Sequence, residues 1–370
     1  MTTKINTVVV GGGAMGLSVA YNLLKRGFDA LVIEGDYLNA GSTGRNMGIL
    51  KERIPHAMED GNEDLISLAQ RGLKLHEGLS TETGINTFYR KSGCLTFAKD
   101  EEEMRQLEEY HAHFQRLGIE DIELTPNEIE RRWSYIDASE LVGAFYDPEE
   151  AMAHPFGVVW AYVESIKKME GRVEKQNRVH KISESSEGYK VMAEKGEYEA
   201  ENLVIACGAH SPKLSEQLGF KIPLTPRRKE VLISEPIRPF FGPAFERLST
   251  DYQIAQTMRG EILGTIGYMS PGFDLSECTS NFLNQFADET VPMIPSFRNL
   301  RIIRQWVGIC DKTPDEKPVV GSLDDGLYIT CGNYDYGINL APVVGQLLAD
   351  SIIKDRIDPL LEPFNPHRFK

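Results

Sequence analysis

Three glycines near the N-terminus have the spacing of a phosphate-binding turn. Residues 6–16 read N-T-V-V-V-G-G-G-A-M-G, so a G-x-G-x-x-G pattern directly follows a β-branched run. In such a turn the first glycine permits the bend, the second lets the backbone approach a pyrophosphate, and the third allows a helix to pack closely on its strand. The helix N-terminus then offers free N–H groups and a partial positive charge to phosphates. The dinucleotide-binding residues expected here are Gly11, Gly13, Ala14, Met15 and Gly16.

An acidic residue after the next apolar run supports the same interpretation. The run Ala30 to Ile33 ends in Glu34. That residue lies about 20 positions beyond the turn, where a carboxylate binds ribose hydroxyls. A carboxylate there disfavours the 2′-phosphate of NADP, which leaves FAD and NAD as candidates. The alternative is an ordinary strand-to-helix turn that binds no ligand.

These residues require a strand, a turn and a helix to position them. The β-branched run predicts a strand from Thr7 to Val10, and apolar residues at helical spacing from Leu17 predict the helix. The apolar run Leu203 to Ala206 is typical of a further parallel strand buried on both faces. Residues 327–330 and 338–353 predict a last strand and helix of the same domain.

The remaining segments predict a second domain inserted into the first. Amphipathic helices are expected at 62–84, 101–118 and 155–170, and another begins at Thr125-Pro126. Strand patterns at 142–146, 229–234, 252–257 and 261–268 favour a largely antiparallel sheet, and 172–201 resembles a β-hairpin. The fold class is therefore α/β, with a Rossmann-type domain at 1–84, 150–222 and 310–370. The substrate domain is expected at 85–149 and 223–309.

Composition excludes several classes of function. The 370 residues are 41% hydrophobic and carry a formal net charge of −15, which makes a nucleic-acid partner improbable because phosphate backbones attract basic surfaces. We expect no signal peptide and no apolar run of membrane-spanning length, and hence a cytoplasmic protein. The five cysteines lack C-x-x-C spacing, which argues against a metal site or a disulfide framework.

With these pieces in place, the chain resembles the D-amino-acid oxidase-like, glutathione-reductase-2-type family of FAD enzymes. It is most similar to the branch of sarcosine oxidase β subunits and dye-linked L-proline dehydrogenase β subunits. The resemblance covers nearly the whole length and lies in four blocks. They are Val8 to Glu34, the run G-S-T-G-R-N at 41–46, N-L-V-I-A-C-G-A-H-S-P-K-L at 202–214, and Trp306 to Pro342.

The resemblance implies a Rossmann-type FAD-binding domain and assigns cofactor contacts. Glu34 is expected at the adenosine ribose, Val179 at the adenine and Gly208 against the cofactor. The segment with Ser42, Thr43, Arg45, Asn46 and Gly48 is expected along the pyrophosphate and flavin, although Arg45 alternatively pairs with a surface carboxylate. The amides of Gly337, Ile338 and Asn339 are expected to face the pyrimidine end of the flavin ring, where oriented N–H groups stabilise the negative charge of the reduced form.

Family members oxidise the C–N bond of an amine, and the resemblance points to residues on the substrate side. Lys51 matches the position at which sarcosine oxidases hold the substrate carboxylate with an arginine; a solvated loop lysine is the alternative. Gly308 matches the cysteine that attaches flavin in monomeric sarcosine oxidases, so FAD is expected to be non-covalent. Asn339 matches a lysine of the oxidases, and its neutral amide favours a dehydrogenase. Tyr252 and Tyr336 are expected to line the substrate pocket, with core packing as the alternative.

The leading hypothesis is an FAD-dependent dehydrogenase that acts on a small secondary amino acid, such as proline or sarcosine, and passes electrons to an acceptor other than O2. One alternative is an oxidase of glycine, a D-amino acid or glycerol 3-phosphate that makes hydrogen peroxide. Another is a flavin-carrying subunit that works only within an electron-transfer complex. A bare NAD-binding protein is disfavoured, because that fold has no use for the block from Trp306 to Pro342.

Overall fold

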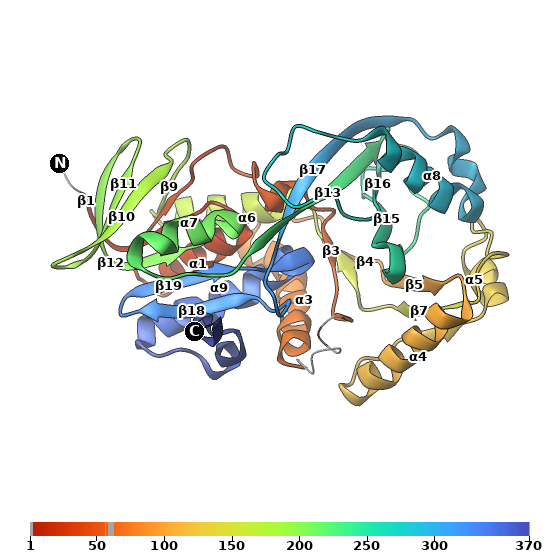
Figure 1. The fold of residues 1–370 in the computed structure, drawn as a ribbon, viewed down its shortest axis with the longest axis horizontal. Coiled ribbons are helices and arrows are strands. Elements are labelled where there is room, and N and C mark those ends of the chain that lie inside the picture. Colours follow the sequence, from red (N-terminus) through yellow and green to blue (C-terminus); the bar gives the residue numbers. More distant parts are fainter. Residues whose placement is uncertain (1–2, 56, 58–62, 370) are drawn as a thin grey trace.

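Two lobes lie side by side along the longest axis of the computed structural model (Figure 1). The structure describes residues 3–55, 57 and 63–369. One lobe, drawn at the left, contains a sheet with parallel central strands, and the other contains a largely antiparallel sheet. The long strands β13 (Thr225–Ser234) and β17 (Ile302–Lys312) run from one lobe towards the other. The α/β fold class with two different sheets is confirmed.

The first sheet is centred on parallel strands in the order β9, β2, β1, β12 and β19. Strands β10 and β11 extend it as an antiparallel hairpin on β12, and β18 pairs antiparallel with β19. The bounds are β1 (Thr3–Val10), β2 (Ala30–Ile33), β9 (Arg172–Glu174), β10 (Val179–Ser185), β11 (Gly188–Ala193), β12 (Gly196–Ile205), β18 (Val319–Asp324) and β19 (Leu327–Cys331). The expected hairpin at 172–201 and strand at 203–206 are thus joined, because β12 continues from the hairpin into the parallel part of the sheet.

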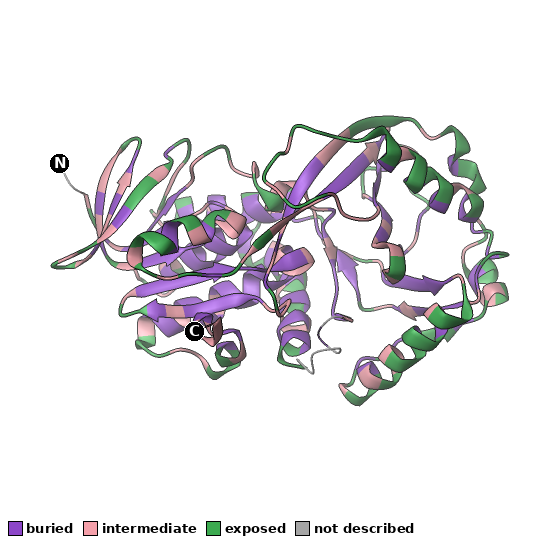
Figure 2. Cartoon of the chain, in the orientation of Figure 1, coloured by how far each residue is buried: buried purple, intermediate pink, exposed green. Residues whose placement is uncertain are grey.

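Helices of the first lobe bury its apolar strands. Helix α1 (Ala14–Lys25) packs against both α6 (Pro155–Lys168) and α9 (Gly337–Lys354), while α3 (Glu63–Thr83) packs on α9. The short α7 (Ser211–Ser215) follows β12. Figure 2 shows buried residues concentrated in these strands and helices. The segment Tyr334–Lys354 has the length and hydropathy of a membrane span, contrary to expectation. However, 72% of its apolar 18-residue window is buried inside the protein, as in a core helix.

The second sheet has the order β17, β13, β16, β15, β14, β5, β7, β6, and its pairs are antiparallel except β14 with β5. Its other strands are β5 (Cys94–Ala98), β6 (Ile122–Leu124), β7 (Gly143–Asp147), β14 (Ala244–Arg247), β15 (Tyr252–Gln256) and β16 (Ile262–Thr265). Helices α4 (Glu101–Arg116), α5 (Pro126–Arg132) and α8 (Ser280–Met293) belong to this lobe. The sequence reasoning did not anticipate α8. The domain boundaries stay a prediction, and β17 crosses the one placed at residue 310.

A small sheet lies between the lobes and leads into the site. It pairs β3 (Ile49–Leu50), β8 (Ala151–Met152) and β4 (Arg90–Lys91). Because β3 directly precedes Lys51, this sheet fixes the backbone from which the expected substrate-binding lysine extends.

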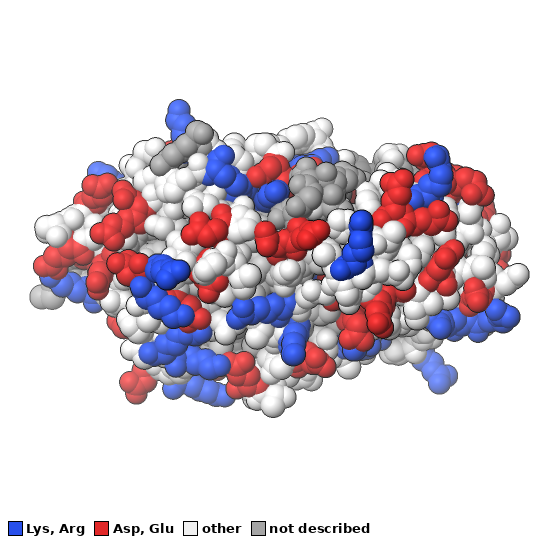
Figure 3. Space-filling view, turned by 90° about the horizontal axis from the view of Figure 1, so that it is seen from below, with Lys and Arg blue, Asp and Glu red and all other residues white. Residues whose placement is uncertain are grey.

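On the face shown in Figure 3, acidic and basic side chains are intermingled rather than gathered into one charged field.

Candidate active site

The glycine turn after β1 has a geometry that larger residues would not fit. Gly11 has a φ of +117°, and a Cβ on it would lie 2.3 Å from the carbonyl oxygen of Ala206. A Cβ on Gly16 would lie 2.1 Å from the carbonyl oxygen of Gly11. The turn therefore brings α1 into direct contact with the ends of β1 and β12, as a phosphate-binding turn requires.

The first turn of α1 is only partly capped by the rest of the chain. Thr43 Oγ1 accepts from Ala14 N–H at 3.1 Å, but within the described residues no side chain accepts from the N–H groups of Met15 and Gly16. Glu34 lies beside the turn, and its Oε2 accepts from Gly12 N–H at 2.7 Å. An open helix start next to a carboxylate is the arrangement expected for the pyrophosphate and ribose of a dinucleotide.

Residues 41–48 wrap over this turn and are fastened to the second sheet. Ser42 Oγ donates to the Ile309 carbonyl at 2.6 Å, and Arg45 Nη1 donates to the Val307 carbonyl at 3.0 Å. Trp306 Nε1–H returns a hydrogen bond to the Arg45 carbonyl at 2.9 Å. The guanidinium of Arg45 thus binds backbone carbonyls, since its Nε also donates to Ala40. This corrects the alternative in which Arg45 pairs with a surface carboxylate.

The other residues of the expected cofactor set surround the same edge of the first sheet. Asn46 Nδ2 donates to the Thr43 carbonyl at 2.6 Å, and Gly48 N–H donates to Asn46 Oδ1 at 2.8 Å. Val179 begins β10 just after Asn177, whose N–H donates to the Glu34 carbonyl at 2.9 Å. Gly208 follows β12 and lies beside Asp311. The structure thus brings these residues together near one edge of the first sheet.

The start of α9 lies beside Lys51, the residue expected to bind the substrate carboxylate. Its N-cap, Tyr336, makes no capping hydrogen bond with its side chain, and the described part of the chain places no other capping side chain there. Asn339 is buried, and its Nδ2 donates to the Lys51 carbonyl at 2.6 Å. No described residue donates to Asn339 Oδ1, which is buried. The first turn of α9 therefore ends in an amide that fixes Lys51 and retains an unused acceptor.

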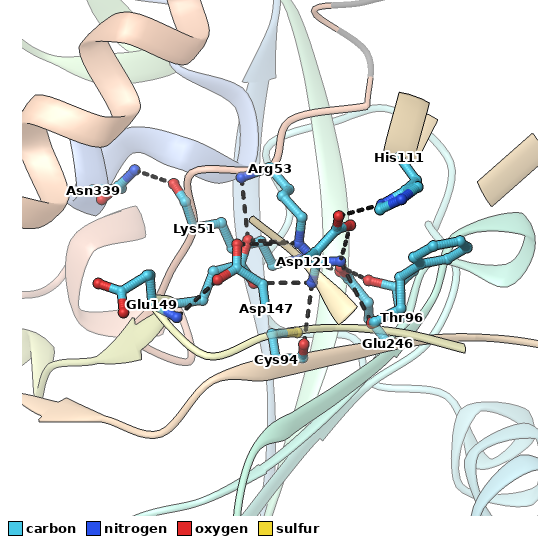
Figure 4. A network of polar contacts seen from close by, with 12 residues as sticks. Lys51, Arg53, Cys94, Thr96, His111, Asp121, Asp147, Glu149, Glu246 and Asn339 are labelled. Carbon is cyan, nitrogen blue, oxygen red and sulfur yellow. Dashed lines mark hydrogen bonds and ion pairs between the residues drawn. The ribbon is translucent and has the colours of Figure 1, made fainter. Parts of the chain in front are cut away.

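Lys51 forms an ion pair with Glu246, a residue of β14 (Figure 4). Burial is the largest single influence and lowers the pKa of Lys51, but the surrounding acidic groups, led by the Glu246 carboxylate, together outweigh it and raise that pKa. Burial raises the pKa of Glu246, but Lys51 and Arg53 lower it further than burial raises it. Both groups are therefore charged at neutral pH. Thr96 Oγ1 also donates to Glu246 Oε1 at 2.8 Å, which holds the carboxylate towards Lys51. The solvated-loop alternative for Lys51 is thus wrong.

Arg53, two residues further along, holds three other buried carboxylates. Its guanidinium lies 3.4 Å from oxygens of both Asp147 and Glu150 and 3.6 Å from Asp121 Oδ2. Burial raises the pKa values of Asp147 and Glu150 above the ordinary range in spite of Arg53. Within the described residues, Lys51 and Arg53 together form ion pairs with four carboxylates, those of Glu246, Asp121, Asp147 and Glu150, and Figure 4 shows this cluster.

Cys94, Glu150 and Glu246 place three possible metal-ligand atoms within 4.8 Å of one another. Lys51 and Arg53 already neutralise the two glutamates. Burial raises the pKa of the Cys94 thiol well above its ordinary range, so it stays protonated. A metal ion binds thiolates rather than thiols. The expectation of no metal site therefore stays a prediction, and these groups are better described as part of the ion-pair cluster.

The two expected pocket tyrosines have different positions. Burial raises the pKa of the Tyr336 hydroxyl most, followed by the carboxylates of Asp335 and Glu246, so Tyr336 lies near Glu246. Tyr252 is 0% exposed, packs against Phe97 and Phe286, and its hydroxyl bonds Thr290 Oγ1 at 2.9 Å. The expectation that Tyr252 lines the pocket is therefore corrected, because every part of its side chain is used within the core of the second lobe.

A second buried network lies between β13, β17 and the turn before α9. Lys229 Nζ is 3.0 Å from Asp335 Oδ2, which also accepts from the Tyr268 hydroxyl at 2.7 Å. Cys310 Sγ donates to Asp335 Oδ1 at 2.9 Å. Burial raises the pKa of Asp335, but Lys229 and these hydrogen bonds lower it to about 2. Lys229 pairs in register with Gly308, so the network lies directly beside the strand position that the family resemblance singled out.

Comparison with known proteins identifies the family of this chain. Residues 6–351 match the family model described as FAD dependent oxidoreductase. The chain belongs to the FAD-dependent oxidoreductase family. It is 26% identical over 381 residues to the sarcosine oxidase subunit beta of Rhodobacter capsulatus, covering 99% of this chain and 89% of the relative. It is 24% identical to the glycine oxidase of Geobacillus kaustophilus, covering 99% and 97%.

A solved structure with the same fold is L-proline dehydrogenase from P. horikoshii, with a TM-score of 0.92 and 27% identity. The match covers 100% of this oxidoreductase and 98% of that chain. The glycine oxidase structure from Geobacillus kaustophilus follows at a TM-score of 0.89. The resemblance to this family expected from the sequence is thus confirmed.

The residues of this FAD-dependent oxidoreductase fit an FAD. The glycine turn gives the pyrophosphate close access to backbone, and Glu34 supplies a carboxylate beside it. The first turns of α1 and α9 also keep N–H groups that no described side chain binds. Sequence reasoning missed Glu246, Arg53 and the Lys229–Asp335 pair. The available signal was a charged residue within an apolar strand, as in A-F-E-R at 244–247, which indicates either a buried partner or a site.

Proposed function

We propose that this enzyme is a dehydrogenase that oxidises the C–N bond of a small secondary amino acid of the L-proline or sarcosine type. Bound FAD would accept the hydride at flavin N5, and its electrons would pass to an acceptor other than O2. The observation that carries the proposal is the charged, buried Lys51 held beside the start of α9 by Asn339. The names of the relatives, sarcosine oxidase subunit beta and L-proline dehydrogenase, support the substrate class.

The proposed contacts with FAD follow from the positions described above. The N–H groups at the start of α1 would bind the pyrophosphate, and Glu34 the ribose. The N–H groups of Gly337 and Ile338, at the start of α9, would face the pyrimidine end of the flavin, since a helix N-terminus stabilises negative charge. Lys51 would hold the substrate carboxylate as a point charge, without the fork of an arginine.

We also infer that the FAD is held without a covalent bond. The family position for an attached cysteine is Gly308 here, and the nearest cysteine on the same strand is Cys310. Burial, followed by the carboxylate of Asp335, raises the pKa of Cys310 well above its ordinary range. A thiol in that state is a poor nucleophile.

Two observations favour a dehydrogenase over an oxidase. Asn339 is neutral, and the nearby ammonium of Lys229 is neutralised by Asp335. Both reduce the positive charge available to an oxygen anion. The alternative of a flavin-carrying subunit is favoured by the sarcosine oxidase relatives, whose name describes a subunit. The five cysteines, all within the described ranges, are free thiols, which suits the proposed cytoplasmic location.

The test is an anaerobic absorbance titration of the purified protein with L-proline, sarcosine, glycine, D-alanine and glycerol 3-phosphate. Bleaching of the flavin band by L-proline or sarcosine, with slow recolouring in air, supports the proposal. Fast recolouring with formation of hydrogen peroxide supports the oxidase instead. Bleaching without turnover by artificial dyes supports the electron-transfer subunit, and bleaching by glycerol 3-phosphate alone contradicts an amino-acid substrate.

A further inference from the structure

Lys51 and Glu246 form an ion pair with each other that is buried inside the protein. The two side chains are 11% and 5% exposed. Across the ranges that the structure describes, Glu246 is the carboxylate in ion-pair contact with Lys51. The residues come from different parts of the fold, since Lys51 follows β3 of the small sheet between the lobes and Glu246 lies on β14 of the second lobe. A ligand carboxylate that binds Lys51 therefore competes with Glu246 for its ammonium.

Separating the pair leaves Glu246 without a substitute cation. Arg53 is the nearby candidate, but its guanidinium is shared by Asp121, Asp147 and Glu150. Thr96 supplies one hydrogen bond to Glu246 but no charge. A buried carboxylate that loses the cation in direct contact with it is strongly destabilising. A ligand with a negative charge alone would therefore bind Lys51 at the expense of stranding Glu246.

A ligand with a positive charge alone meets the converse difficulty, because it would bind Glu246 and strand the Lys51 ammonium. A zwitterion meets neither, since it supplies one charge to each partner. An additional acceptor is also present. The buried Asn339 Oδ1 receives no hydrogen bond from a described residue, and its amide nitrogen is bonded to the Lys51 backbone. An ammonium or secondary amine has N–H donors for this oxygen.

We propose that the Lys51–Glu246 pair is a receptor for a zwitterion, which opens so that Lys51 binds the carboxylate and Glu246, with Asn339, binds the amine of one amino acid. This inference rests on the proposed function for the arrival of the substrate at Lys51. It adds a second binding residue and a rule of selection. Compounds that carry both charges on one carbon bind tightly, whereas monocarboxylates, simple amines and glycerol 3-phosphate bind much more weakly.

Three ligands built on the same quaternary carbon test this rule without being oxidised there. They are 2-aminoisobutyrate, pivalate, in which a methyl replaces the ammonium, and tert-butylamine, in which a methyl replaces the carboxylate. Binding to the FAD-loaded protein is measured by calorimetry and by perturbation of the flavin absorbance. We expect 2-aminoisobutyrate to bind about tenfold or more tightly than either singly charged ligand. Equal or tighter binding of pivalate would overturn the proposal.

Glu246→Gln separates the two halves of the receptor. It should weaken 2-aminoisobutyrate by about tenfold and strengthen pivalate, since Lys51 no longer has to leave a carboxylate. Glu289→Gln is the matched control, because Glu289 is a buried glutamate paired with Arg247, the next residue along β14. It should leave the order of the three ligands unchanged. If Glu246→Gln weakens both acids equally, the assignment of the amine to Glu246 is wrong.

Lys51→Gln provides a second variant if Glu246→Gln does not fold, and it should abolish pivalate binding. Retained pivalate binding would contradict the carboxylate role of Lys51. The proposed function fails separately, when no amino acid bleaches the flavin of the wild-type protein. The receptor proposal fails when an amino acid does bleach it but the zwitterion has no advantage over the singly charged ligands.

Discussion

Replacing Arg53 by methionine should destabilise the folded protein in a way that depends on pH. Arg53 is 4% exposed and lies within 3.6 Å of three buried carboxylates. Removing one partner of a buried ion pair costs about 3–5 kcal/mol, and three carboxylates place Arg53→Met at the upper end of that range. Methionine fills much of the volume, so the loss reports charge rather than a cavity.

The sign of the pH dependence follows from the carboxylates. Burial raises the pKa values of Asp147 and Glu150 in the folded protein above their ordinary values. A carboxyl with a raised folded pKa binds more protons when folded, so stability falls as pH rises from the unfolded to the folded pKa. Without Arg53 these folded pKa values rise further. The loss caused by Arg53→Met should therefore be smaller at about pH 5 than at about pH 8.

Urea unfolding followed by intrinsic fluorescence at both pH values measures this difference. Arg259→Met is the matched control, because Arg259 is 70% exposed in its ion pair with Glu261. An exposed pair contributes about 0–1 kcal/mol, so this variant should unfold nearly like the wild type at both pH values. A loss for Arg53→Met that equals the control, or that is the same at both pH values, would refute the reasoning.

Three further outcomes follow from the site. Gly11→Ala should lower the ratio of FAD to purified protein severalfold, because its Cβ would meet a carbonyl oxygen. Gly27→Ala should retain FAD, because Gly27 is also at positive φ but has open space around it. Equal loss of FAD in both variants would contradict the steric argument. Asp335→Asn should speed the reoxidation of dithionite-reduced protein by air, because Lys229 regains an unneutralised charge, and an unchanged rate would remove that residue from the account. Acid precipitation should release all of the yellow colour into the supernatant, and colour retained by the pellet would show a covalent flavin.

The parts of the fold that local sequence determines were predicted well. The strand Ala30–Ile33 has the expected bounds, and helices expected at 101–118 and 155–170 span Glu101–Arg116 and Pro155–Lys168. Apolar spacing and capping residues act over a few positions, so a single sequence carries this information. The helix from Ser280, which was not predicted, also has a capping residue in the sequence, because Thr279 accepts from Phe282 N–H.

The errors come from contacts that spacing does not encode. Lys51 and Glu246 are separated by 195 residues, so their pairing depends on how the two lobes meet. Tyr252 was placed on the wrong face because alternation along a strand distinguishes two faces without saying which one is the core. The glycine turn, by contrast, was found because its chemistry and its geometry lie within six residues.

The hydrogen bonds between residues 42–45 and β17 set the order in which the chain can be completed during synthesis. Ser42 and Arg45 leave the ribosome early, but the carbonyls of Val307 and Ile309 that hold them are made more than 260 residues later. Strand β19, which belongs to the first sheet, and helix α9, which contacts Lys51 through Asn339, come later still. A nascent chain that already contains the glycine turn therefore still lacks the strand that holds residues 42–45 and the helix α9. Cofactor uptake is consequently expected only after translation has passed the start of α9 at Gly337.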